Sequence, residues 1–136
     1  MLQIVYISSA RRPIGSDQLE EILDISRRNN QLHQVTGLLL AAGRRFLQAL
    51  EGPSDAVLAT YARIAADPRH GALVQLGCRT VETRQFGDWS MAFRGGGEIG
   101  GAADLRGEVE RLVAPLDDAN LRAQFAGFAE LHARAA

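Results

Sequence analysis

Residues 35–51 read VTGLLLAAGRRFLQALE, which is two apolar runs separated by a short turn. The runs at 35–42 and 45–51 have the length and composition of β-strands, and Gly43-Arg44 between them is typical of a turn. This pattern predicts a β-hairpin in the middle of the chain. The hairpin gives a fixed point from which the elements on either side can be placed.

The segments on both sides of the hairpin show alternating strand and helix patterns. Short β-branched runs indicate strands, and apolar residues three and four positions apart indicate helices. The expected elements are, in chain order, a strand at 2–8, a helix with Ser16 as its N-cap that ends at Asn29-Asn30, the hairpin, a helix from 53 to about 67, a strand at 73–81 and a short strand at 89–93.

This order of elements, β-α-β-β-α-β followed by a fifth strand, is that of the ferredoxin-like α+β fold. In that arrangement the first and third strands lie side by side at the centre of the sheet. Both helices then cover one face of the sheet. We therefore expect the hairpin and the first strand to form the middle of a single domain.

The other face of the sheet also needs a cover, because the strands are apolar on both sides. In the first strand Ile4 and Tyr6 point one way while Val5 and Ile7 point the other. A sheet with one solvated face should show polar residues there. We expect a C-terminal helical pair to cover it, so that residues 1–94 form the main domain and 95–136 a Gly-rich joint with the pair. The pair is either an output element or a capping and dimerisation tail.

Composition excludes several classes of chemistry. The chain has 136 residues, and its 15 basic residues, all Arg, face 16 acidic residues for a net charge of -1. Without Lys, neither a Schiff base nor a Walker-type phosphate site can form. The near-neutral balance argues against nucleic-acid and anionic-membrane partners.

Other features of the composition indicate the compartment and the lack of a metal site. Cys78 is the single cysteine, so no internal disulfide can form. No signal peptide is indicated, and no segment approaches the roughly 20 apolar residues of a membrane span. We therefore expect a cytoplasmic protein. The histidines at 33, 70 and 132 show no metal-ligand spacing, and no metal site is expected.

Tyr6 and Gln48 are the first candidates for chemistry. Both fall on the expected central strands, and Tyr6 points toward the helices. A Gln within an apolar strand is costly unless it is hydrogen-bonded. The two side chains could satisfy each other, or both could contact a polar ligand between the helices, for which the amide offers a donor and an acceptor.

Several other residues have both a structural and a functional interpretation. Asn29 and Asn30 could cap a helix, and Arg63 and Asp67 could form an ion pair one turn apart. Both pairs could instead flank a ligand cleft. Trp89 and Met91 lie two residues apart on the last strand, where core packing is the simpler interpretation.

Two further hypotheses use the same fold. Arg11 and Arg12 follow the first strand, where a loop Arg could bind an anion as in acylphosphatase-like hydrolases. The loop lacks a glycine-rich phosphate cradle, which weakens that alternative. The chain could also be a colourless ferredoxin-like regulatory or dimerisation module.

Taken together, the motifs resemble those of the BLUF family, the blue-light sensors that use FAD. The resemblance covers residues 1 to about 94, in order and with family-like spacing. The matching runs are VYIS at 5–8, SRRNN at 26–30, TGLL at 36–39, FLQALEG at 46–52, YARI at 61–64, DPRH at 67–70 and FGDWSM at 86–91. Each run alone is modest, but their combination is highly specific.

The resemblance implies an FAD between the two helices, with the edge of its ring on Tyr6 and Gln48. Ile22 and Ile64 would lie on either side of the ring. The other implied cofactor-binding residues are Asn29, Asn30, Arg63 and Asp67. Arg is a suitable partner for a phosphate because it can bind it through two nitrogens.

The resemblance also implies a photocycle without turnover of a substrate, so the chain is not expected to be an enzyme. Excited flavin takes an electron and a proton from Tyr6, and Gln48 rotates or tautomerises before the charges recombine. The flavin absorption shifts to the red and recovers in the dark. Trp89 and Met91 would pass the change to a separate effector protein, and we expect a homo-oligomer. The remaining 40 or so residues are too few for an effector enzyme of usual size.

Overall fold

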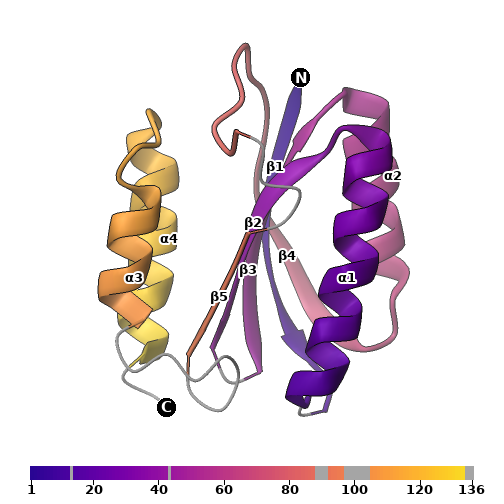
Figure 1. The fold of residues 1–136 in the computed structure, drawn as a ribbon, viewed down its shortest axis with the longest axis vertical. Helices are drawn as coiled ribbons and strands as arrows, with labels where there is room; N and C mark the ends of the chain where they lie inside the picture. Colours follow the sequence, from indigo (N-terminus) through magenta and orange to yellow (C-terminus); the bar gives the residue numbers. More distant parts are fainter. Residues whose placement is uncertain (13, 43, 88–91, 97–104, 134–136) are drawn as a thin grey trace.

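The computed structural model describes residues 1–136 except 13, 43, 88–91, 97–104 and 134–136. The described residues form five strands and four helices (Figure 1). The strands are β1 (Leu2–Ala10), β2 (Thr36–Ala42), β3 (Arg45–Gly52), β4 (His70–Thr80) and β5 (Ala92–Gly96). The helices are α1 (Ser16–His33), α2 (Ser54–Ala66), α3 (Leu105–Val113) and α4 (Ala119–Ala133).

All five strands belong to one sheet, in the order β4-β1-β3-β2-β5. The hairpin is present, with β2 antiparallel to β3, and β1 pairs antiparallel with both β3 and β4. The fifth strand joins the edge of the sheet parallel to β2. With β1 and β3 side by side at its centre, the sheet confirms the predicted ferredoxin-like α+β fold.

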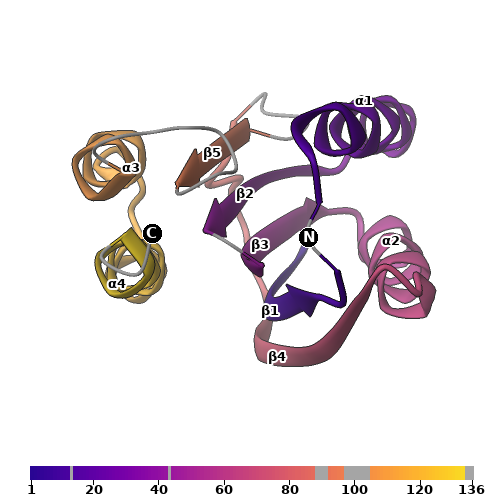
Figure 2. The ribbon, with the colours of Figure 1, turned by 90° about the horizontal axis from the view of Figure 1, so that it is seen from below.

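The sheet lies between two helical layers, as Figure 2 shows. Helices α1 and α2 cover one face, and α3 and α4 cover the other. Alternate residues of β1 pack on opposite faces of the sheet. Ile4 and Tyr6 belong to the core under α1 and α2, whereas Val5 belongs to the core under α3 and α4. The expectation that a C-terminal helical pair covers the second face is confirmed.

The first helix is longer than its sequence predicts. Ser16 is its first residue rather than its N-cap, which is Gly15, and the cap makes no side-chain hydrogen bond. The helix continues past Asn29-Asn30 to His33 and ends at Gln34, whose φ of 60° lies in the left-handed region. Asn30 is only 1% exposed. Its burial outweighs the weak helix propensity of asparagine, so the helix does not stop there.

The strand ends also differ from the expectation. Strand β1 extends to Ala10 and β4 begins at His70 because these two residues are paired. The fifth strand was expected at 89–93 but lies at Ala92–Gly96, where Gly95 and Gly96 pair with the end of β2. The first glycines of the expected joint therefore belong to the sheet, since a parallel ladder needs only backbone groups. None of the helices in the described ranges could cross a membrane.

Candidate functional site

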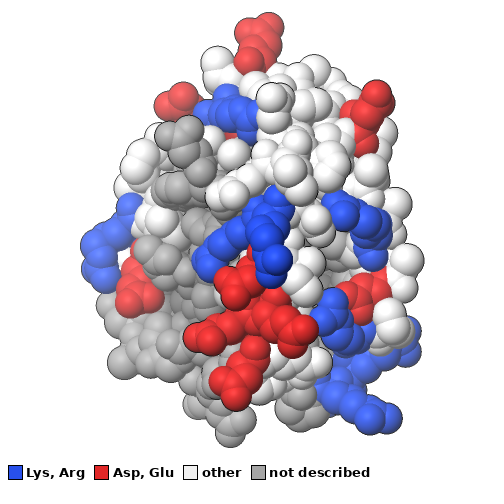
Figure 3. Space-filling view, turned by 45° about the vertical axis from the view of Figure 1, so that its right-hand side comes forward, with Lys and Arg blue, Asp and Glu red and all other residues white. Residues whose placement is uncertain are grey.

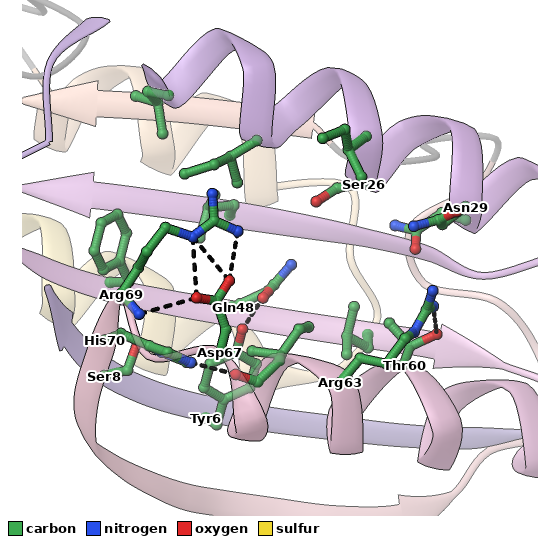
Figure 4. Close-up of a pocket in the computed structure, with 18 of the residues that line it drawn as sticks. Tyr6, Ser8, Ser26, Asn29, Gln48, Thr60, Arg63, Asp67, Arg69 and His70 are labelled. Atoms are coloured by element: carbon green, nitrogen blue, oxygen red, sulfur yellow. Dashed lines mark hydrogen bonds and ion pairs between the residues drawn. The ribbon is translucent and has the colours of Figure 1, made fainter. Parts of the chain in front are cut away.

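Tyr6 and Gln48 form a buried pair at the centre of the sheet. They are directly opposite each other in the β1–β3 register, and the two residues are 3% and 6% exposed. The phenol O–H of Tyr6 donates to Oε1 of Gln48 (Figure 4). The ring of Tyr61 on α2 packs against Tyr6 edge to face, with centroids 5.5 Å apart.

The environment of Tyr6 keeps its phenol protonated. Burial raises the pKa of Tyr6 far above the ordinary value of a tyrosine, and the nearby Tyr61 raises it further. Burial also raises the pKa of Tyr61. A neutral phenol hydrogen-bonded to a neutral amide can therefore persist over the whole physiological pH range.

This pair lines a cavity of about 220 Å³ between α1, α2 and the sheet. In Figure 4, Ser26 and Asn29 of α1 approach the cavity from one side, and Thr60 and Arg63 of α2 approach it from the other. Every predicted cofactor-binding residue lines it, namely Tyr6, Ile22, Asn29, Asn30, Gln48, Arg63, Ile64 and Asp67. Trp89 and Met91 lie outside the described residues.

The structure shows different partners for Arg63 and Asp67 than the ion pair expected one helical turn apart. Asp67 binds Arg69 instead, with Nε of Arg69 3.0 and 2.9 Å from the two carboxylate oxygens. These hydrogen bonds are the main reason that the pKa of Asp67 is below its usual value. Arg63 donates to Oγ1 of Thr60 at 3.3 Å. Both arginines line the cavity.

Some lining residues were not singled out as site residues from the sequence, among them Ser8, Ser26 and His70. Ser8 could have been found, because it is two residues after Tyr6 on the same strand and so points to the same face. Ser26 is four residues after Ile22, which places both on one face of α1. His70 shows no such pattern; its ring nitrogen contacts the backbone oxygen of Ile64 at the end of α2.

The lining fits a flat, polar-edged ring that carries an anionic group. Ile22 and Ile64 provide apolar walls from opposite helices, while the amides of Asn30 and Gln48 provide donors and acceptors. The cationic side chains at the cavity suit a phosphate. On the face seen in Figure 3, a central group of acidic side chains lies with arginines beside it, so both signs of charge are present there.

The hydrolase hypothesis gains no support from this geometry. Arg11 donates to the backbone oxygen of His70 at 3.2 Å, and neither Arg11 nor Arg12 lines the cavity. Among the residues that the structure describes, no cluster of His, Cys, Asp and Glu could hold a metal ion. The chemistry available at the cavity is that of a phenol, amides, hydroxyls, arginines, one carboxylate held by Arg69, one imidazole and apolar walls.

Comparisons with known proteins agree with the resemblance seen in the sequence. The family model described as sensors of blue light using FAD matches residues 1–92. The blue light- and temperature-regulated antirepressor BluF of Escherichia coli is 39% identical over 88 residues, which are 65% of this chain and 22% of that protein. Subunit beta of the photoactivated adenylate cyclase of Euglena gracilis is 36% identical over 89 residues, 65% of this chain and 10% of that protein.

A solved structure extends the similarity beyond the matched segment. The dark-state structure of BlrB, a BLUF protein, has a TM-score of 0.72 and 31% identity, and the alignment covers 93% of this chain and 95% of that one. The chain thus spans a small part of the two curated relatives but nearly the whole of BlrB. With a family model that matches most of its length and a site built from the family's motifs, the chain belongs to the BLUF family of blue-light sensors.

Proposed function

We propose that the cavity between α1 and α2 binds FAD and that Tyr6 and Gln48 are the photoactive residues. The observation that carries this proposal is the buried, hydrogen-bonded Tyr6–Gln48 pair in the wall of the cavity. Ile22 and Ile64 would hold the faces of the ring. The remaining contacts would come from Asn29, Asn30, Arg63 and Asp67.

The side chains have the properties that this role needs. A bound flavin supplies the absorption of blue light and the oxidising power of its excited state. Tyr6 is a neutral phenol, so it can give up an electron together with its proton and later take both back. Oε1 of Gln48 already accepts a hydrogen bond from the phenol O–H. When that proton leaves, the amide can rotate or tautomerise and present a different donor pattern on each side.

FAD is proposed rather than FMN. The family description names FAD, whereas a structure similar to this chain, that of Klebsiella pneumoniae BlrP1 at 26% identity, is described with FMN. Arginines at the cavity would suit either, because both cofactors carry phosphate. Denaturing the purified protein and separating the released flavin by chromatography gives the answer. Release of FMN alone would contradict this part of the proposal.

The output is proposed to pass to another protein. The relatives differ in the output that their names give, since one is an antirepressor and another a cyclase subunit. Residues 95–136 contribute α3 and α4, which we propose as the output element of a sensor domain at 1–94, with Trp89 and Met91 on the connecting segment. A homo-oligomer and a cytoplasmic location stay predictions from the sequence.

Spectroscopy of the purified protein tests the photocycle. We expect a yellow protein whose flavin absorption shifts reversibly to the red under blue light. Tyr6→Phe and Gln48→Leu should keep the colour and lose the shift, because each removes one partner of the pair. Tyr61→Phe is the matched control and should keep the shift. A normal red shift in Tyr6→Phe would refute the role of that phenol.

A further inference from the structure

A second polar pair lies on the same two strands as Tyr6 and Gln48. Gln3 is opposite Glu51 in the β1–β3 register, just as Tyr6 is opposite Gln48. Each member is three residues from its counterpart, about 10 Å along the strand. Because side chains alternate between faces, the Gln3–Glu51 pair points away from the cavity, toward α3 and α4.

Glu51 is a buried carboxylate whose two oxygens both accept hydrogen bonds. It is 0% exposed. Its Oε2 accepts from Nε2 of Gln3 at 3.1 Å, and its Oε1 accepts from the backbone N–H groups of Gln85 at 2.7 Å and Phe86 at 3.1 Å. Such a group is costly to bury, and its hydrogen bonds offset that cost. Glu51 thereby ties β3 to the loop after β4.

Two connections continue from this pair to the turn between α3 and α4. On one side, Oε1 of Gln85 accepts from the backbone N–H of Asp117 at 2.9 Å. On the other, Nε of Arg79 donates to Oε1 of Gln3 at 3.3 Å, and the same guanidinium forms an ion pair with Asp118. The two connections meet at neighbouring residues, so with Glu51 they close a ring.

The far end of this ring is the start of α4. Oδ1 of Asp118 accepts from the backbone N–H groups of Asn120 at 2.9 Å and Leu121 at 3.2 Å, which makes Asp118 the cap of that helix. Gln3 and Glu51 are thus each one side chain away, through Arg79 and Gln85, from the residues at the N-terminus of α4.

We propose that Glu51 and Gln3 are positioning residues that couple the Tyr6–Gln48 pair to the α3–α4 turn. The two pairs share one register, so a displacement of β1 against β3 at the photoactive pair also displaces Gln3 against Glu51. This route passes through the centre of the sheet and differs from the one proposed along Trp89 and Met91. The inference rests on the proposed photocycle.

Amide hydrogen exchange of the full chain with its flavin, in the dark and under blue light, tests the coupling. The informative amides are those of Asp117, Asn120 and Leu121. In the unmodified protein we expect their exchange rates to differ at least about fivefold between light and dark, the low end of typical coupling between sites. In Glu51→Gln that ratio should fall to about one, while the red shift stays. Glu82→Gln, the same change on an exposed residue of the same loop, should keep the ratio.

The ratio of the exchange rates in light and dark distinguishes coupling from a merely structural role of Glu51. If Glu51 only held the loop, Glu51→Gln would speed exchange equally in light and dark and leave the ratio intact, which would overturn the inference. A red shift without any change at these amides in the unmodified protein would overturn it too. Absence of the red shift itself would instead refute the proposed function.

A second variant covers the case in which Glu51→Gln does not fold. Gln85→Leu leaves Glu51 and its donors in place and removes only the acceptor of the Asp117 amide. Gln85 is half-buried at the edge of the ring, so this variant perturbs the core less. We expect it to lose the light response at Asp117. A retained response there would contradict the coupling through this ring.

Discussion

The ring of Phe86 meets the ring of Phe125 edge to face, with centroids 6.3 Å apart and planes inclined at 76°. Phe86 follows β4, and Phe125 lies in the middle of α4. They are 1% and 0% exposed and belong to one core with residues of β1, β2 and β3. The C-terminal helical pair therefore shares a hydrophobic core with the sheet.

Removal of the Phe125 ring should destabilise the whole protein. We expect Phe125→Ala to lower the free energy of unfolding by about 3–5 kcal/mol, as for other buried aromatic residues. Chemical denaturation measures this change. Leu131→Ala, on the same helix but 70% exposed, is the control and should change stability by less than about 0.5 kcal/mol. Equal effects of the two substitutions would mean that α4 does not pack as described.

A side chain at Gly52 should disturb the junction between α1 and β2. A Cβ atom there would lie 2.6 Å from the backbone oxygen of Gln34, so the backbone itself would have to shift. We expect Gly52→Ala to cost about 1–3 kcal/mol, as for other overpacked sites. Gly127→Ala in α4 meets nothing within 4 Å and should stabilise by about 0.5–1 kcal/mol. Thermal unfolding should show a lower melting temperature for Gly52→Ala and a higher one for Gly127→Ala.

Alkaline pH should weaken the fold through Tyr6. Its pKa is raised in the folded state, so above about pH 10 the unfolded chain loses this proton while the folded chain keeps it. The stabilisation is complete below pH 10, and we expect it to fall above that by up to about 1.4 kcal/mol per pH unit. The free energy of unfolding, measured from pH 8 to 11, should fall less steeply with pH in Tyr6→Phe than in the unmodified protein. Identical slopes would show that Tyr6 titrates normally.

Acidic pH should lower the stability of the fold through Asp67. Its pKa is lowered by Arg69, so the ion pair stabilises the protein above the ordinary carboxyl value of about 4 and is lost as pH falls below it. We expect a small effect because both side chains are partly exposed. Asp67→Asn and Arg69→Gln should each reduce the loss of stability between pH 5 and 2. The double variant should add nothing further, and additive effects would exclude direct coupling.

The sequence predicts the centre of the molecule well because two independent patterns meet there. Alternation in residues 2–8 and the hairpin at 35–51 together place Tyr6 and Gln48 on adjacent central strands, and in the structure the two residues are directly opposite each other. The apolar residues on both faces of β1 also predict the cover on the second face. These features depend on strand periodicity, which short apolar runs express strongly.

Other features depend on contacts that no local pattern contains. Asn30 looks like a helix end but is buried inside α1, and Gly95 and Gly96 look like a linker but pair in the sheet. Glu51 looks like the polar end of a strand. Its burial depends on the two backbone N–H groups of Gln85 and Phe86, which are more than 30 residues away in the sequence. Only the folded chain brings such donors to it.

The arrangement of the two helical layers bears on how a partner could act on the sensor. The cavity lies between α1 and α2, while α3 and α4 lie across the sheet from it (Figure 2). A protein bound to the outer surface of α3 and α4 would not cover this cavity, so binding of a partner there and binding of the proposed cofactor would be sterically independent. Any dependence of one on the other must be energetic and therefore reciprocal: whatever preference a partner has for the illuminated state, it stabilises that state by the same free energy.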